Sequence, residues 1–116
     1  MNTSYFTSKK ILQPNLKLVS ISRKPPVWFT LSHQIYNPLC PSWDLVMSYK
    51  SGEITEEAYT IRYYNEILNN LEPARTYQEL GEDAILLCFE KAGDFCHRRI
   101  VADWFLKHLQ IEVKEL

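Results

Sequence analysis

The densest group of reactive side chains in the sequence lies between positions 88 and 99. This short segment contains two thiols, two carboxylates, an imidazole and two guanidinium groups, contributed by Cys88, Glu90, Asp94, Cys96, His97, Arg98 and Arg99. Thiols, imidazoles and carboxylates carry out nucleophilic and acid–base catalysis, and guanidinium groups bind phosphate and carboxylate. The segment is therefore the predicted centre of the functional site.

Two predicted elements position these groups. The unbroken apolar run Ala84 to Phe89 indicates a strand that is buried on both faces, as in the middle of a parallel sheet. A final helix is expected from about Phe95 to Leu109, with Asp94 or Phe95 at its start. Cys88 then lies near the C-terminal end of the strand, and Cys96 lies in the first helical turn, where free backbone N–H groups attract anions.

Cys96 is the expected nucleophile. The helix N-terminus and the charges of Arg98 and Arg99 stabilise a thiolate at this position. We expect His97 and Glu90 to act as acid–base groups. In the structural alternative, the cysteines are inert, His97 bonds a backbone carbonyl and Arg98 pairs with Glu90.

The orientation of the final helix follows from its periodicity. His97 falls on the same side of the helical wheel as Ile100 and Val101, so we expect it to face the sheet edge, with Arg98 beside it and Arg99 in water. Basic side chains in a first turn oppose the helix dipole by a few tenths to about 1 kcal/mol each. A compensating carboxylate or anion is therefore expected near them.

The rest of the chain alternates between strand and helix patterns. Strands are predicted over Thr3–Phe6, Lys17–Ser22 and, at an edge, Ile111–Val113. Helices are predicted from Trp43 to about Tyr49 after a Ser42 cap, from the Thr55 cap to before Pro73, and over Pro73–Leu80. The buried stripe of the second helix is expected to be Ala58, Ile61, Tyr64, Leu68 and Leu71. These elements predict an α/β fold: a single small domain, residues 1–116, with a mainly parallel sheet flanked by helices.

Bulk composition excludes several classes of protein. A formal net charge of -1 over 116 residues gives no global electrostatic argument for nucleic-acid or membrane binding. No apolar run approaches the ~20 residues of a membrane span, and we expect a cytoplasmic protein. Three cysteines do not form a disulfide framework, so Cys40, Cys88 and Cys96 are expected as thiols or metal ligands.

Metal binding is the weaker interpretation of the cysteines. Cys88, Cys96 and His97 with the distant His33 would supply four ligands, but this spacing is not that of a known zinc motif. We therefore expect no metal and no cofactor.

The residues of this segment, together with two shorter motifs earlier in the chain, resemble one family specifically. Cys88-Phe89-Glu90 followed by Cys96-His97-Arg98, with Ser4-Tyr5-Phe6 and Ile21-Ser22-Arg23 earlier in the chain, resembles the uncharacterised family called domain of unknown function 488. The similarity covers nearly the whole chain, although Cys40 departs from it and receives no role. The resemblance implies no established activity. It implies an α/β domain in which one sheet edge gathers the ligand-binding residues Ser22, Arg23, Cys88 and Arg98 beside Glu90, Cys96 and His97.

Three functions are compatible with these residues. The first is an enzyme acting on a small anionic or nucleotide-like substrate, with Arg23 and Arg98 holding phosphate or carboxylate. The second is a non-catalytic module that binds a nucleotide or a nucleic-acid end. The third is a bacterial or phage regulator that contacts proteins through the apolar region 25–43. The sequence assigns neither an oligomeric state nor a particular ligand.

Overall fold

The middle of the molecule is a strand that is buried along its whole length. In the computed structural model, which describes residues 1–116, all five residues of β4 (Ala84–Cys88) are buried. β4 pairs with parallel strands on both sides, β1 (Asn2–Tyr5) and β2 (Lys17–Ser20). Such a strand exposes neither face to water, which explains why its sequence is continuously apolar.

The sheet has five strands in the order β3-β2-β4-β1-β5, and every pairing is parallel. The outer strands are β3 (Gln34–Ile35) beside β2 and β5 (Lys114–Glu115) beside β1. The α/β fold with a parallel sheet is thereby confirmed. The strand bounds differ in several details: β1 and β2 end at Tyr5 and Ser20, before the predicted Phe6 and Ser22. β3 was not predicted, and β5 begins three residues after the predicted Ile111.

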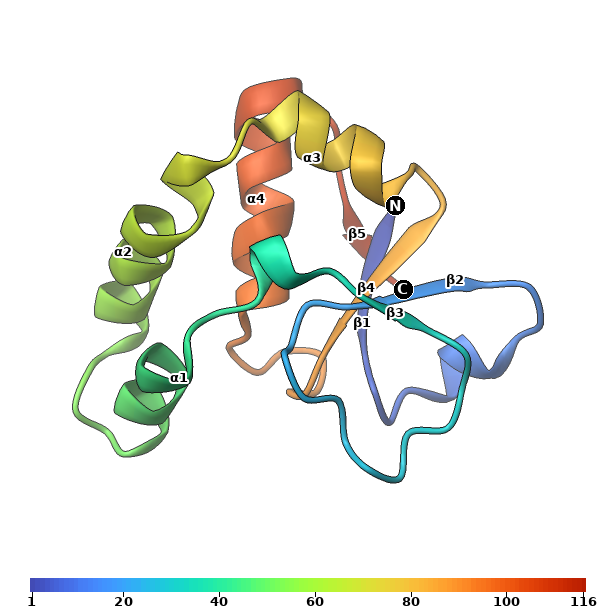
Figure 1. Cartoon of the computed structure of the whole chain (residues 1–116), viewed down its shortest axis with the longest axis horizontal. Helices are drawn as coiled ribbons and strands as arrows, with labels where there is room; N and C mark the ends of the chain where they lie inside the picture. Colours follow the sequence, from blue (N-terminus) through green and yellow to red (C-terminus); the bar gives the residue numbers. More distant parts are fainter.

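The helices are gathered on one side of the sheet (Figure 1). They are α1 (Trp43–Lys50), α2 (Glu56–Glu66), α3 (Pro73–Leu80) and α4 (His97–Leu109). The larger core, which includes Leu45, Leu86 and Phe105, lies between these helices and the sheet. A smaller core around Phe6 and Leu87 covers the opposite face. That face is closed by loops and the short 3-10 helix Lys9–Leu12.

Capping residues set the starts of α1 and α2 as predicted. Ser42 Oγ accepts a hydrogen bond from the Leu45 backbone N–H at 3.1 Å, and Thr55 Oγ1 accepts one from Ala58 N–H at 3.1 Å. These bonds satisfy backbone donors that a helix leaves free at its N-terminus. No helix has the length and apolar character needed to cross a bilayer.

The predicted buried stripe of α2 is confirmed only in part: Leu68 is fully buried, and Ala58, Tyr64 and Leu71 are half-buried. Tyr59 and Tyr63 are buried, whereas Ile61 is 55% exposed. The two tyrosine rings stack, and the Tyr63 hydroxyl donates a hydrogen bond to the Leu39 carbonyl at 2.5 Å. The helix is oriented so that both tyrosine rings are buried and the hydroxyl of Tyr63 has a hydrogen-bond partner. This orientation differs from the one that the aliphatic side chains predicted. α2 also ends earlier, at Glu66, and a 3-10 turn follows over Leu68–Asn70.

Candidate functional site

The C-terminal ends of β2 and β4 place most of the predicted site residues together. These strands are adjacent and parallel, with Ser20 beside Leu87, so the residues that follow them emerge at the same edge. α4 returns to this edge, with Cys96 at its N-cap position. A surface cavity of about 620 Å³ opens there. Among the residues that line it are Ser22, Arg23, Cys88, Glu90, Cys96 and His97.

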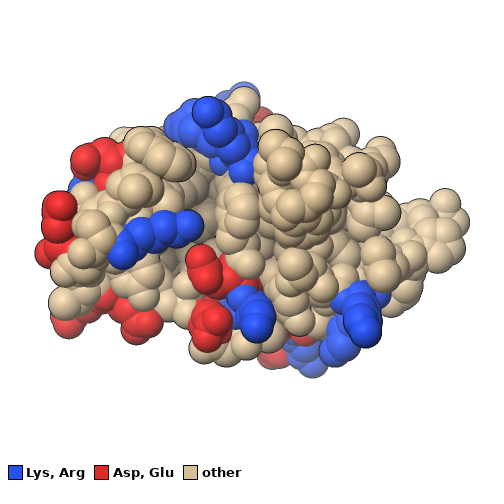
Figure 2. All heavy atoms as spheres, turned by 90° about the horizontal axis from the view of Figure 1, so that it is seen from below, with Lys and Arg blue, Asp and Glu red and all other residues tan.

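The remaining cavity wall is aromatic and basic. α1 contributes Trp43, Tyr49 and Lys50, and the loop after β4 contributes Phe89. Trp43 is 71% exposed and Phe89 45% exposed, so flat apolar faces remain free beside the charged groups. Figure 2 looks onto this end of the molecule and shows basic and acidic side chains among a largely uncharged surface. A cavity of this composition suits a ligand with a planar part and an anionic part.

Sequence reasoning identified only part of this wall. Lys24, Lys50 and Phe89 line the cavity but were not assigned to the site from the sequence. The proximity of Lys24 to Arg23 was the one available signal. Lys50 reaches the site through the packing of α1, and its ammonium nitrogen lies 5.9 Å from the centre of the Phe89 ring. Such long-range placement leaves no local mark in the sequence.

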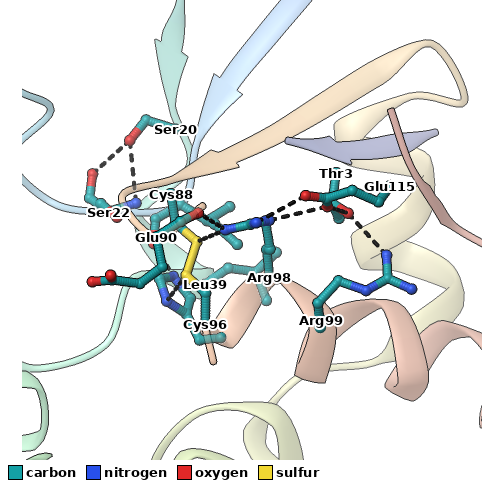
Figure 3. Close-up of a disulfide and its surroundings, with 12 residues drawn as sticks. Thr3, Ser20, Ser22, Leu39, Cys88, Glu90, Cys96, Arg98, Arg99 and Glu115 are labelled. Carbon is teal, nitrogen blue, oxygen red and sulfur yellow. Dashed lines mark hydrogen bonds and ion pairs between the residues drawn. A yellow bond between two sulfur atoms is a disulfide. The ribbon is translucent and has the colours of Figure 1, made fainter. Parts of the chain in front are cut away.

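Cys88 and Cys96 are joined by a disulfide bond (Figure 3), which corrects the expectation that both are free thiols. The loop between them reverses the direction of the chain, so that Cys96 at the N-cap of α4 lies beside Cys88 at the end of β4. Cys40 is the free cysteine, and it is buried. Burial raises the pKa of the Cys40 thiol to about 11, although the charge of Arg23 opposes the shift.

His97 is buried and held in one tautomer. Its Nε2 lies 2.7 Å from the Ile21 carbonyl oxygen, which accepts but cannot donate, so Nε2 carries the proton. Nδ1 therefore keeps its lone pair, and it lies 3.7 Å from Cys96 Sγ. Burial lowers the pKa of His97 to about 4; the Ile21 hydrogen bond opposes this effect, and the charge of Arg98 adds to it. The imidazole is consequently neutral at physiological pH.

Arg98 lies behind the cavity and does not line it. The residue is only 1% exposed, and Figure 3 shows its guanidinium between Cys88 and Glu90 on one side and Glu115 on the other. One nitrogen, Nη1, donates to Cys88 Sγ at 3.1 Å and to the Glu90 backbone carbonyl at 2.7 Å. Nε and Nη2 bind the Glu115 carboxylate at 3.1 and 2.8 Å. Arg98 thus pairs with Glu115, and Glu90 contributes a backbone carbonyl.

Glu115 is the compensating carboxylate that the basic first turn of α4 predicted. It accepts hydrogen bonds from Arg98 and from Thr3 Oγ1, the latter at 2.6 Å. Partial burial of Glu115 favours a higher pKa, but the hydrogen bonds from Arg98 and Thr3 outweigh it and hold the pKa below its ordinary value of 4.5. The carboxylate therefore stays charged and fixes Arg98 against the sulfur of Cys88.

Arg99 does not point into water as the helical wheel predicted. Its Nη1 donates to Thr3 Oγ1 and to the Val113 carbonyl, each at 2.9 Å. The side chain is half-buried and ties α4 to β1 and the C-terminal segment. The length of the side chain lets the guanidinium reach backbone acceptors that a wheel of Cα positions does not include.

The turn after β2 is stabilised by two serines. Ser20 Oγ donates to the Ser22 carbonyl at 2.8 Å and accepts from the Ser22 backbone N–H at 3.1 Å. These bonds fix the backbone just before Arg23, whose side chain is exposed at the cavity. Ser22 therefore orders the approach to the cavity as well as lining it.

Three of the residues considered as metal ligands are brought together. Ligand atoms of Cys88, Cys96 and His97 lie within 4.8 Å of one another, and all three residues are buried. His33 is not part of this group; its Nδ1 lies 2.7 Å from the Leu31 carbonyl oxygen. The structure thus provides a three-donor cluster at the cavity wall in place of the four-residue set considered from the sequence.

Fold and site together define an α/β domain that carries its reactive groups at the C-terminal edge of a parallel sheet. The family model described as the Active DUF488-N3 subclade matches residues 8–109 of this chain. The chain therefore belongs to the family of domain of unknown function 488, as its cysteine, glutamate, histidine and arginine motif indicated. No curated protein and no solved structure matches it.

Proposed function

We propose that the cavity binds a small anionic ligand with a planar group, of the nucleotide type, and that the ligand is acted on at the wall formed by Cys96, His97 and Glu90. The observation that supports this most strongly is the composition of a single cavity of about 620 Å³. Exposed Trp43 and Phe89 offer stacking faces beside the reactive groups. A volume within about 300–1,000 Å³ is usual for small-molecule sites.

Charge supports the anionic part of the ligand. Arg23, Lys24 and Lys50 line the cavity, whereas Glu90 is the carboxylate on the same wall. Arg23 and Lys24 directly follow the serine-ordered turn, whose hydrogen bonds fix the backbone up to Ser22. Arg98, which the sequence suggested as a second anion-binding group, is committed to protein partners. We therefore assign phosphate or carboxylate recognition to Arg23 and the two lysines.

The proposal is tested by isothermal titration calorimetry with nucleoside monophosphates, the corresponding nucleosides and inorganic phosphate. A hydrogen bond to a charged group is worth about 1.5–3 kcal/mol, so Arg23→Ala should weaken monophosphate binding by roughly 10- to 150-fold. Lys107→Ala, which removes an exposed cation of α4 outside the cavity, should bind normally. Equal losses in both variants, or no saturable binding by the native chain, would refute the proposal.

Nucleophilic catalysis by Cys96 is the candidate chemistry favoured by one contact, the 3.7 Å approach of Cys96 Sγ to the lone pair of His97 Nδ1. It requires the dithiol, which forms when a thiol reductant transfers two electrons and two protons to the Cys88–Cys96 disulfide. In the reduced chain, His97 Nδ1 accepts the Cys96 proton as the sulfur attacks an electrophilic atom of the ligand, and the leaving group then takes that proton from His97 as its bond to the ligand breaks.

Alkylation of the reduced chain with iodoacetamide, followed against pH by mass spectrometry of each cysteine peptide, tests this chemistry. A nucleophilic Cys96 should react with a midpoint well below that of an ordinary thiol, about 8.5, while Cys40 reacts slowly. A Cys96 that reacts no faster than Cys40 across the pH range would exclude the role.

The third predicted function, a protein-contact region over residues 25–43, has less support than the cavity. Val27 and Trp28 are exposed, as an interaction surface requires. The end of the same region, however, contributes Pro41 and Trp43 to the cavity. The concave site is thus the feature that we assign to function.

A further inference from the structure

The three-donor cluster has the composition of a catalytic zinc site. We propose that the reduced protein binds one Zn²⁺ through Cys88 Sγ, Cys96 Sγ and His97 Nδ1, with a fourth position that faces the cavity. Two thiolates and one imidazole, with the fourth position left to water or substrate, form a known class of catalytic zinc centre. The inference rests on the proposed ligand cavity, because the fourth position matters only if a ligand enters there.

The spacing of the donors fits a tetrahedral ion. With Zn–S near 2.3 Å and Zn–N near 2.0–2.1 Å, sulfur and nitrogen ligands of one zinc lie about 3.6 Å apart. Cys96 Sγ and His97 Nδ1 are 3.7 Å apart. The Cα atoms of Cys88 and Cys96 are 7.1 Å apart, beyond the span of about 4.4–6.8 Å that is usual for a disulfide. The backbone thus leaves room for an ion between the two sulfurs once they are reduced.

The surroundings orient the ligands in the way that metal sites require. A zinc-bound histidine usually donates its other ring N–H to a carbonyl or carboxylate, and His97 Nε2–H donates to the Ile21 carbonyl at 2.7 Å. Arg98 Nη1 lies 3.1 Å from Cys88 Sγ, where it donates to a thiolate ligand. Glu115 neutralises Arg98, and the two thiolates neutralise Zn²⁺, so the buried cluster carries no net charge.

The electron and proton balance is simple. A dithiol reductant opens the disulfide and becomes a disulfide itself, which leaves two thiols on the protein. Zinc then displaces one proton from each thiol. In catalytic zinc sites of this class, the metal lowers the pKa of its bound water from 15.7 in bulk to roughly 7.

The reaction class that this assigns to the cavity is hydrolysis. Bound there, zinc would supply an activated water for hydrolysis, and Glu90, which lines the same cavity, would take the proton of that water and pass it to the leaving group. This account keeps the proposed ligand and Glu90 but makes Cys96 a ligand of the metal in place of the nucleophile.

Metal content and Co²⁺ spectra of the anaerobically reduced chain test the site. After dialysis against metal-free buffer, one equivalent of Zn²⁺ should be retained, and Co²⁺ should give the visible absorption of a tetrahedral thiolate complex. Cys88→Ser, Cys96→Ser and His97→Gln should each lose stoichiometric binding, whereas Cys40→Ser, the matched control, should keep it. Circular dichroism identifies any variant that fails to fold, and the site is then judged on the other two ligand variants.

The zinc proposal and the nucleophile hypothesis predict opposite reactivities of Cys96 toward iodoacetamide. Added Zn²⁺ should protect both Cys88 and Cys96 from iodoacetamide and leave the slow reaction of Cys40 unchanged. The zinc proposal would be overturned by a native reduced chain that retains no zinc. It would also be overturned if all three ligand variants gave the Co²⁺ spectrum of the native chain.

Arg23→Ala separates zinc binding from ligand binding. This variant should keep zinc and bind the monophosphate more weakly, because Arg23 lines the cavity without belonging to the donor cluster. If the native chain binds the monophosphate through Arg23 but retains no zinc, only the metal site is refuted. If it retains stoichiometric zinc but does not bind the monophosphate, only the ligand proposal is refuted.

Discussion

Replacing Arg98 with methionine should destabilise the domain far more than most single substitutions. Its guanidinium makes two hydrogen bonds to the Glu115 carboxylate, one to the Glu90 carbonyl and one to Cys88 Sγ. Breaking a fully buried ion pair costs about 3–5 kcal/mol. The Glu115 side chain is 24% exposed and is partly rehydrated after the substitution. We therefore expect a loss of about 3 kcal/mol, a large share of the ~5–15 kcal/mol of a typical domain.

Urea unfolding of the reduced protein, followed by tryptophan fluorescence, measures this loss as a shift of the midpoint at constant m-value. Glu115→Gln and the double variant complete a thermodynamic cycle, for which we expect a coupling energy of about 1–2 kcal/mol. Arg62→Met is the control, because Arg62 pairs with Asp44 and Glu66 at the surface and should matter much less. An Arg98→Met variant within about 0.5 kcal/mol of the native chain would refute the reasoning.

Three further predictions follow from burial and charge. Leu86→Ala, in the centre of β4, should cost about 2–5 kcal/mol in urea unfolding, and a loss typical of a surface site would contradict its place in the core. Cys40, whose thiol pKa is about 11, should resist iodoacetamide near pH 8 in the folded chain; modification as fast as in the urea-unfolded chain would contradict its burial. Glu115 has a folded pKa below its ordinary 4.5, so its contribution to stability is present above about pH 4.5 and is lost as the pH falls through the folded value. Acid unfolding should show that loss in the native chain and less of it in Glu115→Gln, and identical pH profiles would exclude the assignment.

Local patterns were sufficient to predict the central strand and the edge of the sheet at which the candidate residues come together. The continuous apolar sequence of β4 has one common explanation, burial on both faces of a parallel sheet. Ser42 and Thr55 predicted helix starts because their side chains satisfy backbone donors within three residues. The same strand-to-helix reasoning predicted that Cys88 and Cys96 share one edge with His97.

Features set by distant contacts were not predictable. Glu115 pairs with Arg98 across 17 residues, and it lies in β5, which begins later than expected. The buried face of α2 depends on Tyr63 reaching a carbonyl 24 residues away. The cavity wall needs the packing of α1 to bring Lys50 to the loop after β4. In each case a long side chain finds its partner in the tertiary structure, which hydrophobic periodicity does not encode.

The most direct test of the central claim is a comparison of two tryptophan variants in nucleoside monophosphate titrations. Trp43 lines the cavity and Trp28 does not, although both indoles are exposed, at 71% and 56%. Stacking on an aromatic side chain is worth about 1–3 kcal/mol per base. Trp43→Leu should therefore weaken binding by roughly 5- to 150-fold, and Trp28→Leu should bind as the native chain does. Equal affinity in all three proteins would contradict the assignment of this cavity to a planar, anionic ligand.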